Sequence, residues 1–98
     1  MPLSGTLRIA ADHPAFAGHF PGPPLLPGVV LLDLILAEAG IAALRGITRA
    51  KFLRPVGPGA RVSYTLENTA PDRLALSVHG AEGVVLRATL RLARSEEG

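Results

Sequence analysis

The chain has 98 residues and a formal net charge of +2, and 48% of its residues are hydrophobic while 18% are charged. This composition is too apolar for a disordered chain. The lack of cysteine excludes a disulfide framework, a thiolate nucleophile and a cysteine-based zinc site. Because so short a chain is near the lower limit for a self-sufficient core, we expect a single domain over residues 1–98 that gains further burial in a dimer.

Composition also bears on partners and location. The ten basic residues are spread along the chain, and one tyrosine, three phenylalanines and no tryptophan leave little material for base stacking, so nucleic-acid binding is not expected. The start "MPLSGTLRIAADH" lacks the basic end and apolar core of a signal peptide. Prolines and Asp33 interrupt the longest apolar stretch. We expect a cytoplasmic protein without membrane contact.

The first half of the chain predicts a short strand, a rigid loop and one long helix. Residues Leu7 to Ala10 have the character of a strand, whereas the proline and glycine density from Asp12 to Pro27 favours a stiff turning loop. From Gly28 to about Leu44 the pattern predicts a helix that is apolar nearly all the way round, which indicates burial on most sides.

The second half predicts a meander of half-buried strands. Three segments alternate apolar and polar residues, and their apolar faces are Val62, Tyr64 and Leu66; Leu74, Leu76 and Val78; and Leu86, Ala88, Leu90 and Leu92. The stretch "ITRAKFL" before them is a fourth candidate strand. One helix followed by a meander predicts an α+β domain whose antiparallel sheet, of about five strands, wraps the helix.

Three groups suited to proton transfer meet around the start of the predicted helix. His19 is an imidazole in the rigid loop, Asp33 is a carboxylate among apolar residues in the second turn, and Gly28 and Val29 carry backbone N–H groups without an intrahelical acceptor. Each also has a plainer explanation. His19 could be a structural loop histidine, Asp33 could favour the helix dipole, and Gly28 could serve only a tight turn.

Two motifs resemble a known family. The segment "HPAFAGHFPGPPLLPGVVLLD" closely resembles the active-site segment of the hotdog-fold 3-hydroxyacyl-[acyl-carrier-protein] dehydratases of the FabA/FabZ type, and especially their short ApeI-like, aryl-polyene-type branch. A second block, "KFLRPVGPG", resembles the strand and turn that follow the helix in that family. Together the two motifs cover about half the chain, in the expected order.

The resemblance implies roles for individual residues. The histidine of "GHFP", here His19, is the catalytic base of that family, and the acidic residue at the position of Asp33 comes from the partner subunit of a dimer. The N–H of Gly28 is implied to bind the thioester carbonyl, and the backbone carbonyl near Leu25 is implied to orient the histidine. Phe20, Leu25 and Val29 are implied to contact the substrate. Phe16, Phe20 and Phe52 are expected to set the depth of the acyl tunnel.

The implied activity is removal of water from a 3-hydroxyacyl thioester to give the trans-2-enoyl thioester, in fatty-acid or polyene-type biosynthesis. The substrate would be carried on phosphopantetheine, on an acyl carrier protein or as a coenzyme A thioester, with no metal or bound redox cofactor. The alternatives are a hotdog acyl thioesterase and a noncatalytic, dehydratase-like subunit of a heterodimer. We expect a homodimer, with a heterodimer or a larger assembly as alternatives.

The other polar residues have simpler explanations. His13 is expected to support the loop, and His79 to be solvated on a strand. Glu38 lies about 140° around the helix from Asp33, at about 100° per residue, so the two do not form an acid/base pair on one face. The cations of the strand that includes Lys51 are expected to be solvated, although an acidic carrier protein could dock on some of them.

Overall fold

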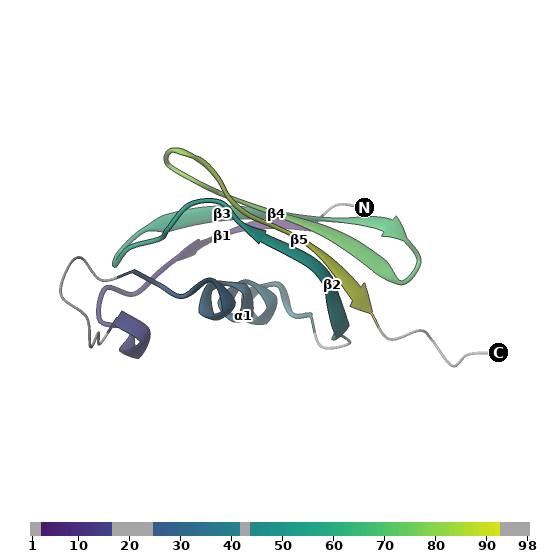
Figure 1. The fold of residues 1–98 in the computed structure, drawn as a ribbon, viewed down its shortest axis with the longest axis horizontal. Coiled ribbons are helices and arrows are strands. Elements are labelled where there is room, and N and C mark those ends of the chain that lie inside the picture. The colour runs from purple at the N-terminus through teal and green to yellow at the C-terminus, as the bar shows by residue number, and fades with distance from the viewer. Residues whose placement is uncertain (1–2, 17–24, 42–43, 93–98) are drawn as a thin grey trace.

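One helix lies across one face of an antiparallel five-stranded sheet in the computed structural model, which describes residues 3–16, 25–41 and 44–92 (Figure 1). The elements are β1 (Leu3–Arg8), a 3-10 turn (Pro14–Phe16), α1 (Gly28–Ala39), β2 (Leu44–Phe52), β3 (Arg61–Ala70), β4 (Arg73–Gly80) and β5 (Gly83–Leu92). The α+β class with one central helix is confirmed. No helix within the described ranges has the length and hydropathy needed to cross a bilayer.

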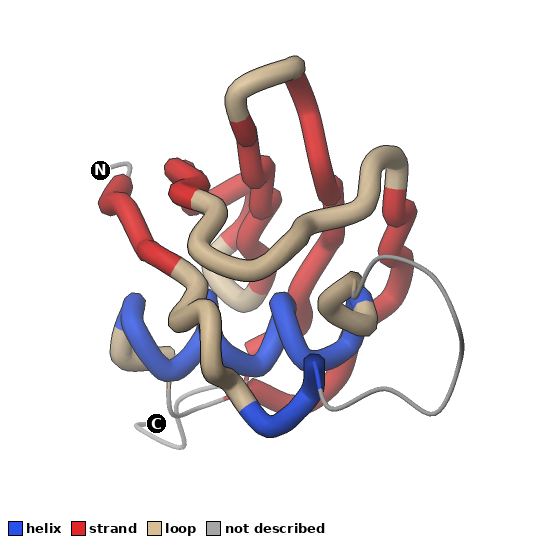
Figure 2. The backbone as a smooth tube through the Cα atoms, turned by 90° about the vertical axis from the view of Figure 1, so that its left-hand side faces the viewer, coloured by secondary structure: helices blue, strands red, loops and turns tan. Residues whose placement is uncertain are grey.

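The sheet has the strand order β1-β3-β4-β5-β2, so β1 and β2 form its two edges. Figure 2 shows that α1 lies against one face of the sheet. This inner face carries the alternating apolar residues of the three central strands. The buried ones are Val62, Tyr64, Leu66, Leu74, Leu76, Val78, Leu86, Ala88 and Leu90. Leu92 is half-buried. The predicted two-residue period is therefore confirmed, because each strand has one face on the helix and one in solvent.

The helix buries one side only. Leu31, Leu32, Ile35 and Leu36 pack into the core, whereas Asp33 and Ala37 are exposed and Val29 is 65% exposed. The prediction of burial on most sides is therefore wrong for the single chain. The physical reason is that one sheet can cover only one side of a helix, however apolar the other side is.

The helix is also shorter than the sequence pattern indicated, because it ends at Ala39 rather than near Leu44. Gly40 has φ 74° and ψ 29°, a left-handed conformation that stops the helix. The N–H of Gly40 donates to the carbonyl of Ala37 and that of Ile41 to the carbonyl of Leu36, as in a Schellman cap. Four residues on, Leu44 begins β2, which is longer than the predicted fourth strand.

Residues 53–60 tie the sheet to the start of the helix through backbone hydrogen bonds. The N–H of Leu53 donates to Val85 O at 2.8 Å, and the N–H of Leu26 donates to Val56 O at 2.8 Å. The end of β1 is fixed in the same way, since the N–H of Ile9 donates to Ala60 O at 2.8 Å. These bonds set where the chain enters α1 relative to β2 and β5.

The first strand, Leu3–Arg8, begins and ends earlier than predicted because its pairing with β3 sets its bounds.

Candidate active site

Four of the six predicted site residues belong to the described part of the chain: Leu25, Gly28, Val29 and Asp33. His19 and Phe20 lie in the range 17–24, outside the described residues. The site is therefore built here from the start of α1 and the elements packed against it.

The N-terminus of α1 leaves backbone donors unpaired within the helix. Pro27 caps it with φ −59° and ψ 140° and offers no side-chain hydrogen bond. The first helical bonds are those from the N–H groups of Val30 and Leu31 to Pro27 O, at 3.0 and 3.1 Å. The N–H groups of Gly28 and Val29 thus have no intrahelical acceptor, and the first turn carries no acidic residue. The positive end of the helix is available to an oxyanion.

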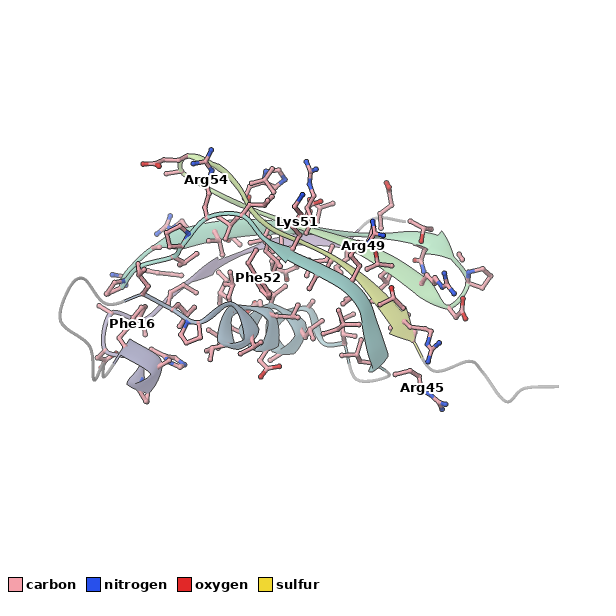
Figure 3. All side chains as sticks on the ribbon, viewed as in Figure 1. Phe16, Arg45, Arg49, Lys51, Phe52 and Arg54 are labelled. Carbon is pink, nitrogen blue, oxygen red and sulfur yellow. The ribbon has the colours of Figure 1, made fainter. Side chains whose placement is uncertain are left out.

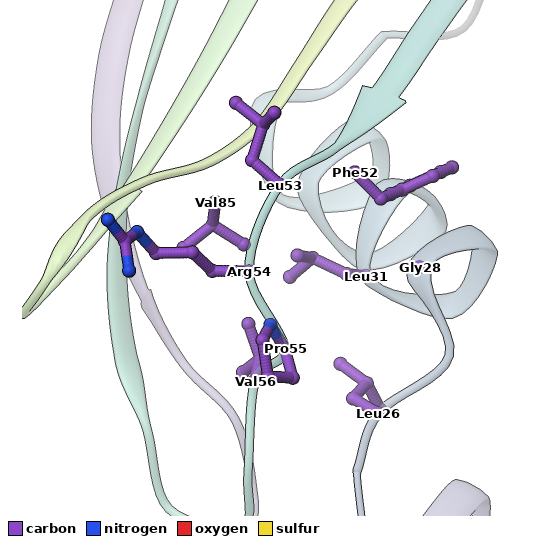
Figure 4. Close-up of a pocket in the computed structure, with 9 residues that line it drawn as sticks. All are labelled: Leu26, Gly28, Leu31, Phe52, Leu53, Arg54, Pro55, Val56 and Val85. Carbon is purple, nitrogen blue, oxygen red and sulfur yellow. The ribbon is translucent and has the colours of Figure 1, made fainter.

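A pocket of about 220 Å³ lies beside this helix terminus (Figure 4). Its lining residues are Leu26, Gly28, Leu31, Phe52, Leu53, Arg54, Pro55, Val56 and Val85. Arg54 is the single charged residue of that lining. Amide donors beside a mostly apolar wall interact more strongly with a developing charge once bound substrate displaces the water.

The ring of Phe52 occupies the space that a side chain on Gly28 would need. A β-carbon placed on Gly28 would overlap the ring, with Cδ1 and Cε1 nearest and Cγ 2.9 Å away. Phe52 points from β2 toward the helix, while its neighbour Lys51 points away from it (Figure 3). Glycine at this position therefore lets an aromatic wall approach the helix terminus.

The predicted substrate contacts Leu25 and Val29 are not part of this pocket lining in the single chain. They are 51% and 65% exposed, respectively. Sequence reasoning instead missed Leu26 and Leu31, although both are close to Gly28 along the chain, and Val85, which is contributed by β5. Nothing in the local sequence identifies Val85, because its place beside the helix terminus comes from contact between β5 and the segment after β2, where the N–H groups of Leu53 and Arg54 donate to Val85 O.

Asp33 lies on a different side of the helix from the pocket. It is exposed and flanked at the i−4 and i+4 positions by Val29 and Ala37, which are also exposed. The expectation of a carboxylate in apolar surroundings is not met within one chain. At about 100° per residue, Asp33 is rotated by about 140° from Gly28 and by about 160° from Leu31, so the helix directs it away from its own pocket.

His13 has a structural role in the loop before the helix. Its Nδ1 accepts the backbone N–H of Ala15 at 3.0 Å, and its ring meets that of Phe16 edge-on, with centroids 6.5 Å apart. His79 is exposed on β4. Among the residues that the structure describes, no group of three His, Asp or Glu side chains is arranged to hold a metal ion.

Comparison with known proteins connects this geometry to a family. Residues 3–88 match the family model for ApeI-like proteins, described as ApeI dehydratase. The chain is 35% identical over 95 residues to a 3-hydroxyacyl-[acyl-carrier-protein] dehydratase FabZ of Mannheimia succiniciproducens, covering 84% of this chain and 63% of that protein. It is 34% identical over an alignment of 113 positions to the FabZ of Klebsiella pneumoniae, covering 97% of this chain and 75% of that protein.

A solved structure shares the fold. The dehydratase heterocomplex ApeI:P of Xenorhabdus doucetiae contains a chain that superposes with a TM-score of 0.79 at 23% identity, covering 95% of this chain and 88% of that one. The single helix on a five-stranded antiparallel sheet is accordingly the hotdog fold. With the motif-bearing residues inside the matched range, the chain belongs to the ApeI-like family of hotdog-fold dehydratases.

Proposed function

We propose that this protein removes water from a 3-hydroxyacyl thioester to give the trans-2-enoyl thioester. The FabZ relatives are named as 3-hydroxyacyl-[acyl-carrier-protein] dehydratases, and this chain spans 63% of the length of one of them and 75% of another. The observation that carries the proposal is the bare N-terminus of α1, whose first residue, Gly28, has an N–H group without an intrahelical acceptor and lines a largely apolar pocket. An enolate-forming reaction requires such donors.

The elimination divides into three tasks, which these residues are suited to share. His19 takes a proton from Cα of the substrate, and the electron pair of that C–H bond moves toward the thioester carbonyl. The N–H of Gly28 donates a hydrogen bond to the carbonyl oxygen as negative charge develops there. As the Cβ–O bond breaks, Asp33 gives a proton to the departing hydroxyl, which leaves as water. The acyl chain of the substrate would contact Phe20, Leu25 and Val29.

The position of Asp33 supports a site made by two subunits. On its own chain the carboxylate is turned away from the Gly28 pocket and is exposed, so it cannot take part in chemistry there. A second copy that packs against the exposed side of α1 would offer its own pocket to Asp33 and would cover the apolar side chain of Val29. The same contact would supply the apolar surroundings that favour a neutral carboxyl group.

The edge strand β2 supports the same assembly. It is nine residues long, its outer edge is unpaired within the described chain, and most of its side chains are exposed. Ile47, Phe52 and Leu53 are exposed apolar residues in or next to it, at 42%, 47% and 42%. Edge strands of this length and character invite pairing with another chain. A homodimer, or a heterodimer with a related subunit, would remove both exposed surfaces.

The proposed chemistry needs an acid, a base and an oxyanion donor, and all three come from the chain. The acyl group would arrive as a thioester of phosphopantetheine, on an acyl carrier protein or on coenzyme A. A thioesterase would act on the same thioester but would release a free thiol and a carboxylic acid. Measurement of the product therefore separates the two reactions.

The test is incubation of wild type and His19→Ala with a 3-hydroxyacyl carrier protein, followed by mass spectrometry for loss of water and by a thiol assay. Wild type should lose water from the substrate without releasing thiol, and His19→Ala should be slower by at least about a hundredfold, as expected for loss of a general base. The matched control is His79→Ala, an exposed histidine on β4 that should retain full activity. Equal rates for wild type and His19→Ala, or release of thiol, would refute the proposal.

A further inference from the structure

The strand register places basic side chains directly opposite one another at three points in the sheet. These like-charged pairs are Lys51 with Arg87, Arg73 with Arg91, and Arg8 with Arg61. All six side chains are exposed. Like charges on directly opposite residues destabilise an antiparallel pair, so the fold keeps these contacts at a cost.

Nothing in the described part of the chain neutralises the pair formed by Lys51 and Arg87. Neither side chain has an ion pair or a hydrogen bond to another described residue. On the β4 side, the residue opposite Arg87 is Ser77. Two residues before Lys51 on β2, Arg49 lies opposite Thr89 of β5. Thr89 in turn lies opposite Ala75 of β4, and Ala75 lies opposite Glu67 of β3, so this acidic residue is three strands away from Arg49. We name Arg49, Lys51 and Arg87 the outer basic patch.

The patch faces away from the helix. Leu86 and Ala88, on either side of Arg87, are buried on the inner face, so Arg87 points outward. Arg49 and Lys51 likewise stand on the side of the sheet opposite α1 (Figure 3). The charged residues of α1 are Asp33 and Glu38, both acidic. The helix therefore carries only acidic charge, whereas the outer face of the sheet is mainly basic and has Glu67 as an acidic residue on β3.

A surface of this kind fits an acidic partner, and its composition favours a protein over a nucleic acid. Phe52 and Tyr64, the phenylalanine and tyrosine of the described strands, both face the inner side. Among the described strand residues, the outer face therefore offers the imidazole of His79 as its single ring for base stacking. The residues between the cations carry hydroxyl or methyl groups: Ser77, Thr89 and Ala75. Electrostatic complementarity on such a surface mainly raises the rate of encounter.

We propose that the outer basic patch docks an acidic acyl carrier protein, a proposal that rests on the function proposed above. The position of the patch explains why the carrier would dock there. Lys51 is followed directly by Phe52, which packs on Gly28, and then by Leu53 and Arg54, which line the same pocket. A carrier held at the end of β2 brings its phosphopantetheine arm close to residues 53–56, which follow β2 directly and line the pocket.

The test compares one acyl group on two carriers. The double variant Lys51→Glu/Arg87→Glu and wild type are assayed with a 3-hydroxyacyl group on acyl carrier protein and on N-acetylcysteamine, which lacks a protein surface. We expect kcat/KM for the carrier-bound substrate to fall by about tenfold or more, with the small thioester unaffected, because reversal of surface charge slows encounter. The loss should shrink as ionic strength rises.

The matched control is Arg8→Glu/Arg61→Glu, which makes the same charge change in a like-charged pair at the opposite edge of the sheet. It should change kcat/KM for the carrier-bound substrate by no more than about twofold, the residual effect of net charge. Equal losses in the two double variants would overturn the proposal. So would equal loss on both substrates, because the patch would then act on folding or chemistry rather than on docking.

Direct binding separates this proposal from the proposed function. Fluorescence anisotropy of labelled acyl carrier protein should show binding to wild type and weaker binding to Lys51→Glu/Arg87→Glu, whether or not the enzyme turns the substrate over. Turnover of neither thioester by wild type, with patch-dependent carrier binding intact, would refute the proposed function alone. Displacement of the carrier by an equal concentration of duplex DNA would identify a nucleic-acid surface and refute the docking proposal.

Discussion

The ring of Phe52, at the end of β2, lies directly against the α-carbon of Gly28, the first residue of α1. This contact joins the edge strand to the helix terminus whose N–H groups are the candidate oxyanion donors. It also closes one side of the pocket beside Gly28. The identity of each residue is therefore tied to that of the other.

The contact predicts that Gly28→Ala is destabilising and that removing the ring relieves the effect. The new β-carbon overlaps the ring, so Gly28→Ala should lower the free energy of unfolding by about 1–3 kcal/mol, as expected for overpacking. In Gly28→Ala/Phe52→Ala the loss should be smaller than the sum of the two single losses, because the overlap no longer exists. Urea unfolding of the four proteins in this cycle measures the coupling. If the loss of unfolding free energy in the double variant equalled the sum of the two single losses, the contact between Gly28 and the Phe52 ring would be contradicted.

Gly40→Ala tests the residue that ends the helix. Gly40 has φ 74°, which an L-residue adopts only at a cost of about 1–2 kcal/mol, and open space around it means that no side-chain clash adds to this cost. Gly46→Ala is the control, because Gly46 also has open space but no positive φ, so alanine there should be neutral or stabilising by up to about 1 kcal/mol. Thermal unfolding compares them, and equal effects would exclude the backbone explanation.

His13 should contribute through its hydrogen bond to Ala15 rather than through catalysis. Loss of the Nδ1 acceptor in His13→Ala should cost about 1 kcal/mol of stability, a typical value for one hydrogen bond. His13→Asn should recover most of this, because an asparagine side chain can accept the same N–H two residues on. Chemical unfolding gives the stabilities, and steady-state turnover should remain close to wild type in His13→Asn. A hundredfold loss of activity there would assign His13 to the chemistry instead.

Val29→Arg tests whether the exposed side of α1 meets a second subunit. Val29 is 65% exposed, so a single folded chain should accept arginine with little change, whereas burying an unpaired charge in an interface is costly. We expect a shift toward monomer in light scattering at matched concentrations, together with loss of activity. Thr65→Arg is the control, since Thr65 is exposed on the outer face of β3. An unchanged molar mass for Val29→Arg would remove this side of α1 from the interface.

Much of the fold can be read from the sequence because it rests on local rules. The two-residue period of Val62, Tyr64 and Leu66 identified the inner face of β3, and the same rule identified the inner faces of β4 and β5. The start of the helix at Gly28 followed from Pro27, whose fixed φ suits a helix start. The end of the helix was missed, because the apolar pattern continues past Gly40 and only its left-handed conformation stops the helix.

The sequence by itself determined the alternating strand faces, the position of the helix start and the motif that assigns the family, because each depends on neighbours along the chain. The tertiary structure alone decided three other features. It placed Phe52 on Gly28, turned Asp33 away from its own pocket, and set Lys51 opposite Arg87. Each of these depends on strand register and on which side of α1 the sheet covers, and those are properties of packing between distant segments.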